Sequence, residues 1–131
     1  CVAKLEAVRA GFEEALFVDE RGYVVEATGE NVFLVKAGQV VAVEHPDALA
    51  GITRDTVAVL AGAERRAVTL DELLDADEVF LTGTSAEVAP VTRLEGRGVL
   101  PVGPVTRALR AQYQDVVHGR SSAAKRWLTW M

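Results

Sequence analysis

The stretch "VVEATGENVFLVKAGQVVAVE", residues 24–44, contains the two apolar runs that decide the fold class. The runs Val32–Lys36 and Gln39–Glu44 are joined by Ala37-Gly38, and this pattern predicts an antiparallel hairpin. Just ahead of it, "EATGEN" carries two glutamates, a glycine and an asparagine. A plain hairpin needs none of these polar residues, so this segment is the first candidate for a functional site.

The composition is that of one globular domain, which we expect to span residues 1–131. The net charge is -5 and the basic residues are scattered, so neither nucleic acid nor an anionic membrane surface is expected as a partner. Cys1 is the only cysteine and cannot form an internal disulfide. No apolar run is long enough to span a membrane and no signal peptide is visible, so we expect a cytoplasmic protein.

Strands and helices are predicted from periodicity and from turn and capping residues. Besides the hairpin, strands are expected at residues 12–19, 22–27, 66–70, 78–83 and 88–94, and helices at residues 52–64, 69–76 and 103–119. Thr69 and Glu72 have the spacing of a capping box. The last helix has an apolar stripe that includes Leu109 and Tyr113. This order predicts a mixed α/β (α+β) domain on a strongly curved sheet, because it lacks the alternation of a doubly wound fold.

The beginning of the chain reads as a helix already under way over residues 2–11 and closed by Gly11. The sequence starts at Cys1 rather than Met, and no N-cap residue precedes the helix. We therefore expect that the sequence was cut from something longer, or processed.

Polar residues and glycines gather at three breaks between elements. Glu26 ends a strand and could face inward to a buried site. Gly51, Ile52 and Thr53 begin a helix, where free backbone N–H groups and the helix dipole bind anions such as phosphate. The turn Gly83–Ser85 follows a buried strand and offers further N–H groups and hydroxyls. Together they indicate a phosphate-bearing ligand with a cationic atom at its far end.

Each of these features also has an ordinary structural explanation. Glu26 is also consistent with a solvated strand residue, Thr53 with a helix cap, and Thr84-Ser85 with a simple turn. Asn31 reads as a turn residue that hydrogen-bonds to local backbone. His45 has no partner histidine at ligand spacing, and no metal is predicted.

The segments "AGFEEALFVDERGYVVEATGENVFLVKAGQV", "GITRDTVAVLA", "LDELLDADEVFLTGTSAEVAPV" and "GPVTRALRAQY" resemble a known family. They are similar to the C-terminal, larger domain of fold-type IV pyridoxal-phosphate enzymes, and among them to the branched-chain amino acid aminotransferases. The resemblance implies a curved, pseudo-barrel sheet flanked by helices. "GENVF" favours these aminotransferases over the D-amino acid aminotransferases and aminodeoxychorismate lyases, in which serine usually replaces the glutamate of this motif.

Roles for individual residues follow from the resemblance. Glu26 would pair with the pyridine nitrogen of pyridoxal 5'-phosphate. Ile52 and Thr53 would hold the cofactor phosphate, and Thr84 would add a further phosphate contact. Thr84 and Ser85 would also meet the α-carboxylate of the substrate.

The resemblance also implies parts that this sequence does not contain. The Schiff-base lysine of the family stands upstream of residue 1, and Lys4, Lys36 and Lys125 do not replace it, so no catalytic residue is assigned here. The arginine-bearing small N-terminal domain is absent as well. The complete protein is expected to be a homodimer that transaminates branched-chain L-amino acids (Leu, Ile, Val) with 2-oxoglutarate as the 2-oxo acid, whereas this chain alone is expected to be inactive. Two alternatives stay open, an enzyme like the D-amino acid aminotransferases or aminodeoxychorismate lyases, and a non-catalytic structural remnant of the fold.

Overall fold

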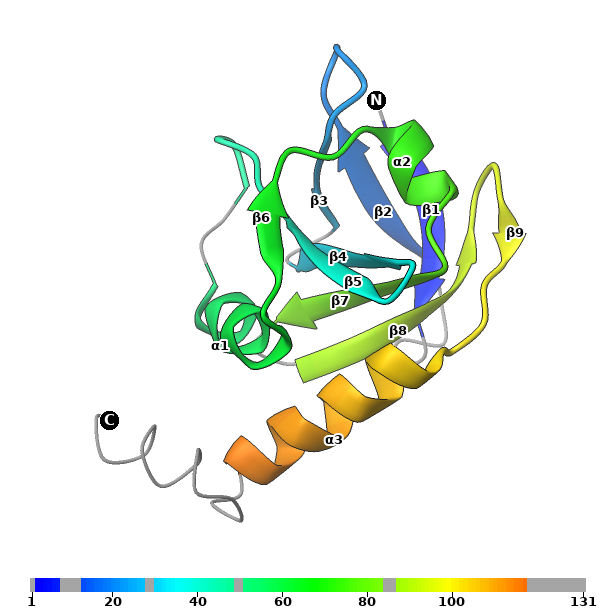
Figure 1. Cartoon of the computed structure of the whole chain (residues 1–131). Helices are drawn as coiled ribbons and strands as arrows, with labels where there is room; N and C mark the ends of the chain where they lie inside the picture. The colour runs from blue at the N-terminus through cyan, green and yellow to red at the C-terminus, as the bar shows by residue number, and fades with distance from the viewer. Residues whose placement is uncertain (1, 8–12, 28–29, 49–50, 84–86, 118–131) are drawn as a thin grey trace.

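The computed structural model describes residues 2–7, 13–27, 30–48, 51–83 and 87–117. This part of the chain is a mixed α/β structure (Figure 1). Its strands are β1 (Val2–Ala7), β2 (Glu13–Val18), β3 (Val24–Ala27), β4 (Asn31–Lys36), β5 (Gln39–Val43), β6 (Glu64–Arg66), β7 (Glu78–Gly83), β8 (Glu87–Leu94) and β9 (Gly98–Val99). Its helices are α1 (Ile52–Ala61), α2 (Leu70–Leu74) and α3 (Pro104–Val117).

The predicted opening helix is wrong, because residues Val2–Ala7 form strand β1. This strand pairs antiparallel with β2 on one side and with β8 on the other. Its sequence alternates, with Lys4 and Glu6 separated by Leu5, as a strand requires. Pairing on both edges provides partners for the backbone N–H and C=O groups, and this outweighs a modest helix preference. The end of the predicted helix, from residue 8 on, lies outside the described residues.

The strands follow the order β3-β2-β1-β8-β7-β4-β5-β6, and β9 pairs with β8. All neighbours are antiparallel except β5 and β6, which are parallel. Among the described residues no ladder joins β3 to β6. Instead, Val24 N donates to Val68 O over 2.8 Å, and Tyr23 forms an isolated bridge with Thr69. Residues just before α2 thus contact β3, but within the described ranges the sheet is not closed.

Two apolar clusters lie on opposite faces of the sheet, as the alternation of side chains along a strand requires. In β4, Val32 belongs to one cluster and Phe33 to the other. The interior cluster consists of Leu16, Val18, Val24, Ala27, Val32, Leu34, Val41, Val43, Val68, Leu73, Ala76, Val79, Leu81, Ala89, Val91, Leu94 and Leu100. The helix-side cluster consists of Phe33, Val35, Val40, Ala42, Val57, Ala58, Phe80, Val88 and Leu109. Helices α1 and α3 cover the second cluster, with α3 running along β8 (Figure 1).

Most predicted turns and caps are confirmed. Ala37 and Gly38 both have positive φ, 52° and 79°, which is the geometry that a two-residue hairpin favours. Thr69 and Glu72 form the predicted capping box at the start of α2. Strand β6 is displaced toward the N-terminus of the predicted range 66–70, because residues 67–69 lead directly into α2. No helix in the described part of the chain is long and apolar enough to cross a membrane.

Candidate functional site

The first turn of α1 contains backbone N–H groups that the helix itself does not pair. Gly51 is the N-cap residue, with extended backbone (φ -141°, ψ 131°) and no side-chain cap hydrogen bond. The amide of Asp55 donates to Gly51 O over 3.1 Å, so the amides of Ile52, Thr53 and Arg54 precede the helical ladder and have no intrahelical acceptor. Ile52 is 85% exposed, so its backbone rather than its side chain faces any site here. Three such N–H groups and the helix dipole make this turn suited to an anion.

Asn31, the first residue of β4, lies against this turn. A Cβ atom built on Gly51 would lie 2.6 Å from Asn31 Oδ1, so only glycine allows this approach. The prediction that Asn31 is a turn residue is wrong, because it pairs in register with Thr82 of β7. The start of β4 and the start of α1 are therefore in direct contact.

Thr82 adds a buried hydroxyl beside Asn31. Its residue exposure is 0%, and its Oγ1 has no hydrogen-bond partner within the described residues. Phe80, two residues earlier in β7, belongs to the helix-side cluster, so Thr82 points to the same face. A buried hydroxyl without a partner is uncommon in proteins. This hydroxyl lies on the same face as Asn31 and is enclosed by the protein.

Thr53 connects α1 to α3 through a contact between side chains. Its Oγ1 lies 3.3 Å from the hydroxyl of Tyr113, and Thr53 itself is only 8% exposed. The sequence predicts Tyr113 correctly as part of the apolar stripe of α3, since its ring packs against the helix-side cluster. The role of its hydroxyl was missed, because a helical stripe shows which face is buried and not which distant residue it meets.

Glu26 is half-buried in β3, but it does not face the interior of the sheet. Its cross-strand partner is Phe17, whose neighbours Leu16 and Val18 both belong to the interior cluster. Phe17 and Glu26 therefore share the opposite face. The expectation that Glu26 faces a buried site stays a prediction. Such a site would lie on the face opposite the interior cluster, because a β-strand places successive side chains on opposite faces. A ligand that paired with Glu26 would lie on the helix side of the sheet.

The short connection between β3 and β4 brings Glu26 close to the other polar groups. Ala27 and Glu30 exchange backbone hydrogen bonds, each of 3.0 Å, across this connection. Glu26 and Asn31 immediately flank this pair, and both lie on the face away from the interior cluster. The candidate site thus has an acid at one side and the first turn of α1 at the other. Thr84 and Ser85, predicted to complete it, lie outside the described residues, although Gly83 is the last residue of β7.

A buried cation lies next to Thr53. Arg54 is 9% exposed, and its guanidinium lies 3.9 Å from Glu44 Oε2 and 3.6 Å from Asp55 Oδ1. Its Nε is buried and has no hydrogen-bond partner within the described residues. A positive charge at a helix N-terminus opposes the helix dipole, and the carboxylates of Glu44 and Asp55 offset it here. Apart from its place in "GITRD", no signal in the sequence points to this residue.

A contact between Asp19 and His45 joins the turn ahead of β3 to the segment that follows β5. His45 Nε2 lies 2.9 Å from Asp19 Oδ2, and Asp47 N donates to His45 Nδ1 over 3.0 Å. Because Nδ1 accepts a hydrogen bond, Nε2 carries the hydrogen and donates it to Asp19. This bond, together with that from Tyr23 N, lowers the pKa of Asp19 to about 2. The turn ahead of Glu26 is thereby held to the segment ahead of Gly51.

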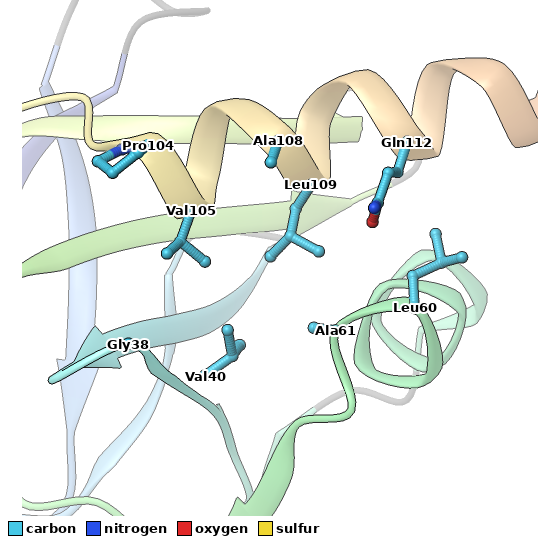
Figure 2. A pocket seen from close by; sticks show the side chains of 9 residues that line it. All are labelled: Gly38, Val40, Leu60, Ala61, Pro104, Val105, Ala108, Leu109 and Gln112. Carbon is cyan, nitrogen blue, oxygen red and sulfur yellow. The ribbon is translucent and has the colours of Figure 1, made fainter.

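An apolar groove lies near the other end of α1, and it does not coincide with these polar groups. Figure 2 shows the groove between α1, α3 and the β4–β5 turn, with Val40, Leu60, Val105 and Leu109 around it. Its volume is about 360 Å³, and no titratable side chain lines it. The polar face at the start of α1 is therefore the better candidate for chemistry.

The chain belongs to the class IV amino-transferase family, whose model matches residues 1–94. Relatives that it matches include branched-chain amino acid aminotransferases. A probable branched-chain-amino-acid aminotransferase of Aquifex aeolicus is 40% identical over 98% of the chain and 44% of the relative. The branched-chain-amino-acid aminotransferase of Pseudomonas aeruginosa is 42% identical over 98% of the chain and 44% of the relative. The chain thus spans less than half the length of these relatives.

The chain is also similar to solved structures of branched-chain amino acid aminotransferases. A branched-chain amino acid aminotransferase from T.th., complexed with N-(5'-phosphopyridoxyl)-L-glutamate, is 44% identical, with a TM-score of 0.82 over 92% of the chain and 42% of that structure. The same protein with pyridoxamine 5'-phosphate is 46% identical, with a TM-score of 0.79 over 92% of the chain and 42% of that structure. These structures therefore hold phosphorylated pyridoxal derivatives, and this chain matches 42% of each of them.

Proposed function

We propose that the chain, residues 1–131, is the cofactor-binding, C-terminal domain of a pyridoxal-phosphate-dependent branched-chain aminotransferase. In a protein of the relatives' full length, the reaction would transfer the amino group of Leu, Ile or Val to 2-oxoglutarate. One observation carries the proposal. The first turn of α1 has no side-chain cap, and its amides without an intrahelical acceptor lie within the segment that matches the family.

The residues of the site fit the chemistry of pyridoxal phosphate. We assign the phosphate to the amides of Ile52 and Thr53 and to the Thr53 hydroxyl, because free amides at a helix start bind phosphate. The guanidinium of Arg54, which is buried and lies near the carboxylates of Glu44 and Asp55, adds positive charge beside this turn. The lack of a Cβ atom at Gly51 lets Asn31 Oδ1 lie against the first turn.

We assign Glu26 to the pyridine nitrogen of the cofactor. When bound, the protonated pyridine ring accepts the electrons released as the Cα–H bond of the amino acid breaks. A carboxylate beside that nitrogen favours its protonated form through charge attraction. Glu26 lies on the helix side of the sheet and flanks the connection to β4 opposite Asn31, which supports a position facing the same ligand as α1.

Further parts of the proposal rest on the sequence resemblance. Thr84 and Ser85 would contribute a second phosphate contact and bind the substrate carboxylate. The sheet would be the curved pseudo-barrel of the family, and the hydrogen bond between Val24 N and Val68 O, near the two ends of the strand order, supports this. The complete protein would form a homodimer.

The lysine that moves the substrate proton would come from outside this chain. Transamination needs an amine that bonds the cofactor and shuttles the proton. Lys36 is held at the β4–β5 turn, where its Nζ donates to Asp75 O over 3.0 Å and lies 3.8 Å from Asp77 Oδ1. Lys4 lies in β1 between two other strands, and Lys125 is outside the described residues. The role of this chain is therefore to hold and orient the cofactor.

The proposal is tested by cofactor binding to the purified chain. We expect pyridoxal phosphate to bind, and Glu26→Gln to weaken binding most at the pH where the ring nitrogen is protonated. Glu20→Gln is the matched control, since Glu20 is exposed in the turn between β2 and β3. Treatment with borohydride should leave the cofactor unattached. A lysine adduct after borohydride, or transfer of the amino group of leucine to 2-oxoglutarate by the chain alone, would contradict these assignments.

A further inference from the structure

We propose that Tyr113 is a positioning residue that orients the Thr53 hydroxyl toward the phosphate of the bound ligand. The inference rests on the proposed function, which places the ligand phosphate beside Thr53. Tyr113 would contact the Thr53 hydroxyl from the side away from that ligand. Tyr113 comes from α3, and the sequence resemblance assigns it no role.

The two hydroxyl groups can form consecutive hydrogen bonds, of which the last is accepted by an anion. Thr53 Oγ1 and the Tyr113 hydroxyl are 3.3 Å apart, and either oxygen can donate. A hydroxyl has one hydrogen to donate. If Thr53 donates to Tyr113, its hydrogen is used and none remains for a phosphate. If Tyr113 donates to Thr53, the Thr53 hydrogen is free to point at the ligand.

A bound phosphate selects the second arrangement. The anion accepts a charge-assisted hydrogen bond from Thr53, and hydrogen bonds that run in one direction strengthen one another. The Tyr113 hydroxyl then donates to Thr53 Oγ1, and Thr53 Oγ1 donates to the phosphate. The ring of Tyr113 packs against the helix-side cluster, so its hydroxyl is held in place rather than free to rotate away.

Because Thr53 is buried, we expect the loss of its partner Tyr113 to affect ligand affinity. Thr53 is 8% exposed, so few water molecules can take over the role of Tyr113. Removing only the Tyr113 hydroxyl leaves Thr53 Oγ1 without a donor, while the ring keeps its packing. Since 3.3 Å is long for a pair of hydroxyls, we expect the loss in affinity to be about threefold to fivefold, at the lower end for a neutral hydrogen bond.

The test is a double-mutant cycle on ligand binding by the full chain. Dissociation constants for pyridoxal phosphate and for pyridoxal, which lacks the phosphate, are measured for the wild type, Tyr113→Phe, Thr53→Val and the double variant. We expect Tyr113→Phe to weaken pyridoxal phosphate about threefold to fivefold and Thr53→Val about tenfold or more. The double variant should match Thr53→Val, and pyridoxal binding should not change. Tyr23→Phe is the control, because Tyr23 loses the same hydroxyl at the β2–β3 turn.

The outcomes separate this inference from the proposed function. If Thr53→Val weakens pyridoxal phosphate but Tyr113→Phe does not, the positioning role is overturned and the phosphate site remains. If the two effects add in the double variant, or if pyridoxal is weakened equally, Tyr113 acts on the structure as a whole and the inference fails. If Thr53→Val has no effect, or the wild type binds no pyridoxal phosphate, the phosphate site and the inference both fail.

Discussion

Asn31 and Gly51 are in contact between β4 and the first turn of α1, and a Cβ atom on Gly51 would lie 2.6 Å from Asn31 Oδ1. Real Cβ atoms do not approach other atoms so closely, so a side chain at position 51 would displace Asn31 or α1. The contact holds the first turn of α1, with the amides of Ile52 and Thr53, beside β4. It is a tertiary contact between residues far apart in the sequence.

Gly51→Ala is expected to destabilise the fold through this contact. The backbone of Gly51 is extended, so alanine is allowed there and the cost comes from overpacking, about 1–3 kcal/mol in the free energy of unfolding. The measurement is urea unfolding followed by circular dichroism. The combined change Asn31→Ala and Gly51→Ala should recover at least about 0.5 kcal/mol of the summed losses, because the two residues are in contact. Strict additivity of the two single changes would show that the contact does not cause the loss.

Glu78 is expected to be required for the start of α3. It is 5% exposed, its Oε1 accepts from Thr106 N over 2.8 Å, and its Oε2 accepts from Val105 N over 3.4 Å. Glu78→Ala leaves these helix-start amides without acceptors in a buried place, at a cost of about 2–3 kcal/mol. Glu78→Gln keeps one acceptor and should cost less. The free energy of unfolding is measured for the wild type and for both variants. Equal stability of the alanine variant and the wild type would disprove the capping role.

Protonation of Asp19 is expected to make the fold less stable in acid. Its pKa is lowered to about 2 from 3.8, first by the hydrogen bond from His45 and then by that from Tyr23 N. Because the folded-state pKa is below the unfolded one, its stabilising effect is present above about pH 4 and is lost as the pH falls toward 2. Unfolding midpoints in urea at several pH values should therefore depend less on pH in this window for Asp19→Asn.

Asp71→Asn is the control for this acid titration, since Asp71 is exposed in α2. Glu72, whose pKa is also lowered by the Thr69 N–H and by Arg66, leaves a residual dependence of the same sign in both variants. An unchanged pH profile in Asp19→Asn would show that the bond to His45 does not stabilise the folded state.

The capping box of α2 gives a further prediction. Thr69 Oγ1 accepts from Glu72 N over 3.2 Å, and the Glu72 carboxylate accepts from Thr69 N over 3.2 Å. Thr69→Ala is expected to cost about 1 kcal/mol in thermal or urea unfolding. Glu72→Gln should cost less, because glutamine also closes a capping box. A loss for Glu72→Gln as large as that for Thr69→Ala would assign the effect to the ion pair with Arg66 instead.

Local signals in the sequence predicted the local features well. The Ala37-Gly38 turn and the Thr69 capping box involve residues within a few positions of each other, and both are confirmed. The opening segment was misread as a helix, because its pairing with β2 and β8 depends on residues elsewhere in the chain. Strand order and pairing partners are tertiary properties that a short window of sequence does not contain.

The candidate site likewise has features that the local sequence indicates and features that it does not. The amides after Gly51 that lack an intrahelical acceptor follow from a helix start that the sequence shows. The contacts of Asn31, Thr82 and Tyr113 with this region depend on strand register and helix packing, and no local pattern in the sequence indicates them. The facing direction of Glu26 also depends on register, since a shift of one residue reverses the face of every side chain in a strand.

The most direct test of the central claim is the position of the cofactor phosphate. The measurement is the change in the ¹H–¹⁵N chemical shifts of assigned amides as pyridoxal phosphate is added to the full chain, compared with pyridoxal. We predict that the phosphorylated ligand alone shifts the amides of Ile52 and Thr53 more than any others in α1, and that the Glu26 region responds to both ligands. Shifts confined to other parts of the chain, with Ile52 and Thr53 unchanged at saturation, would contradict the assignment of the phosphate to the first turn of α1.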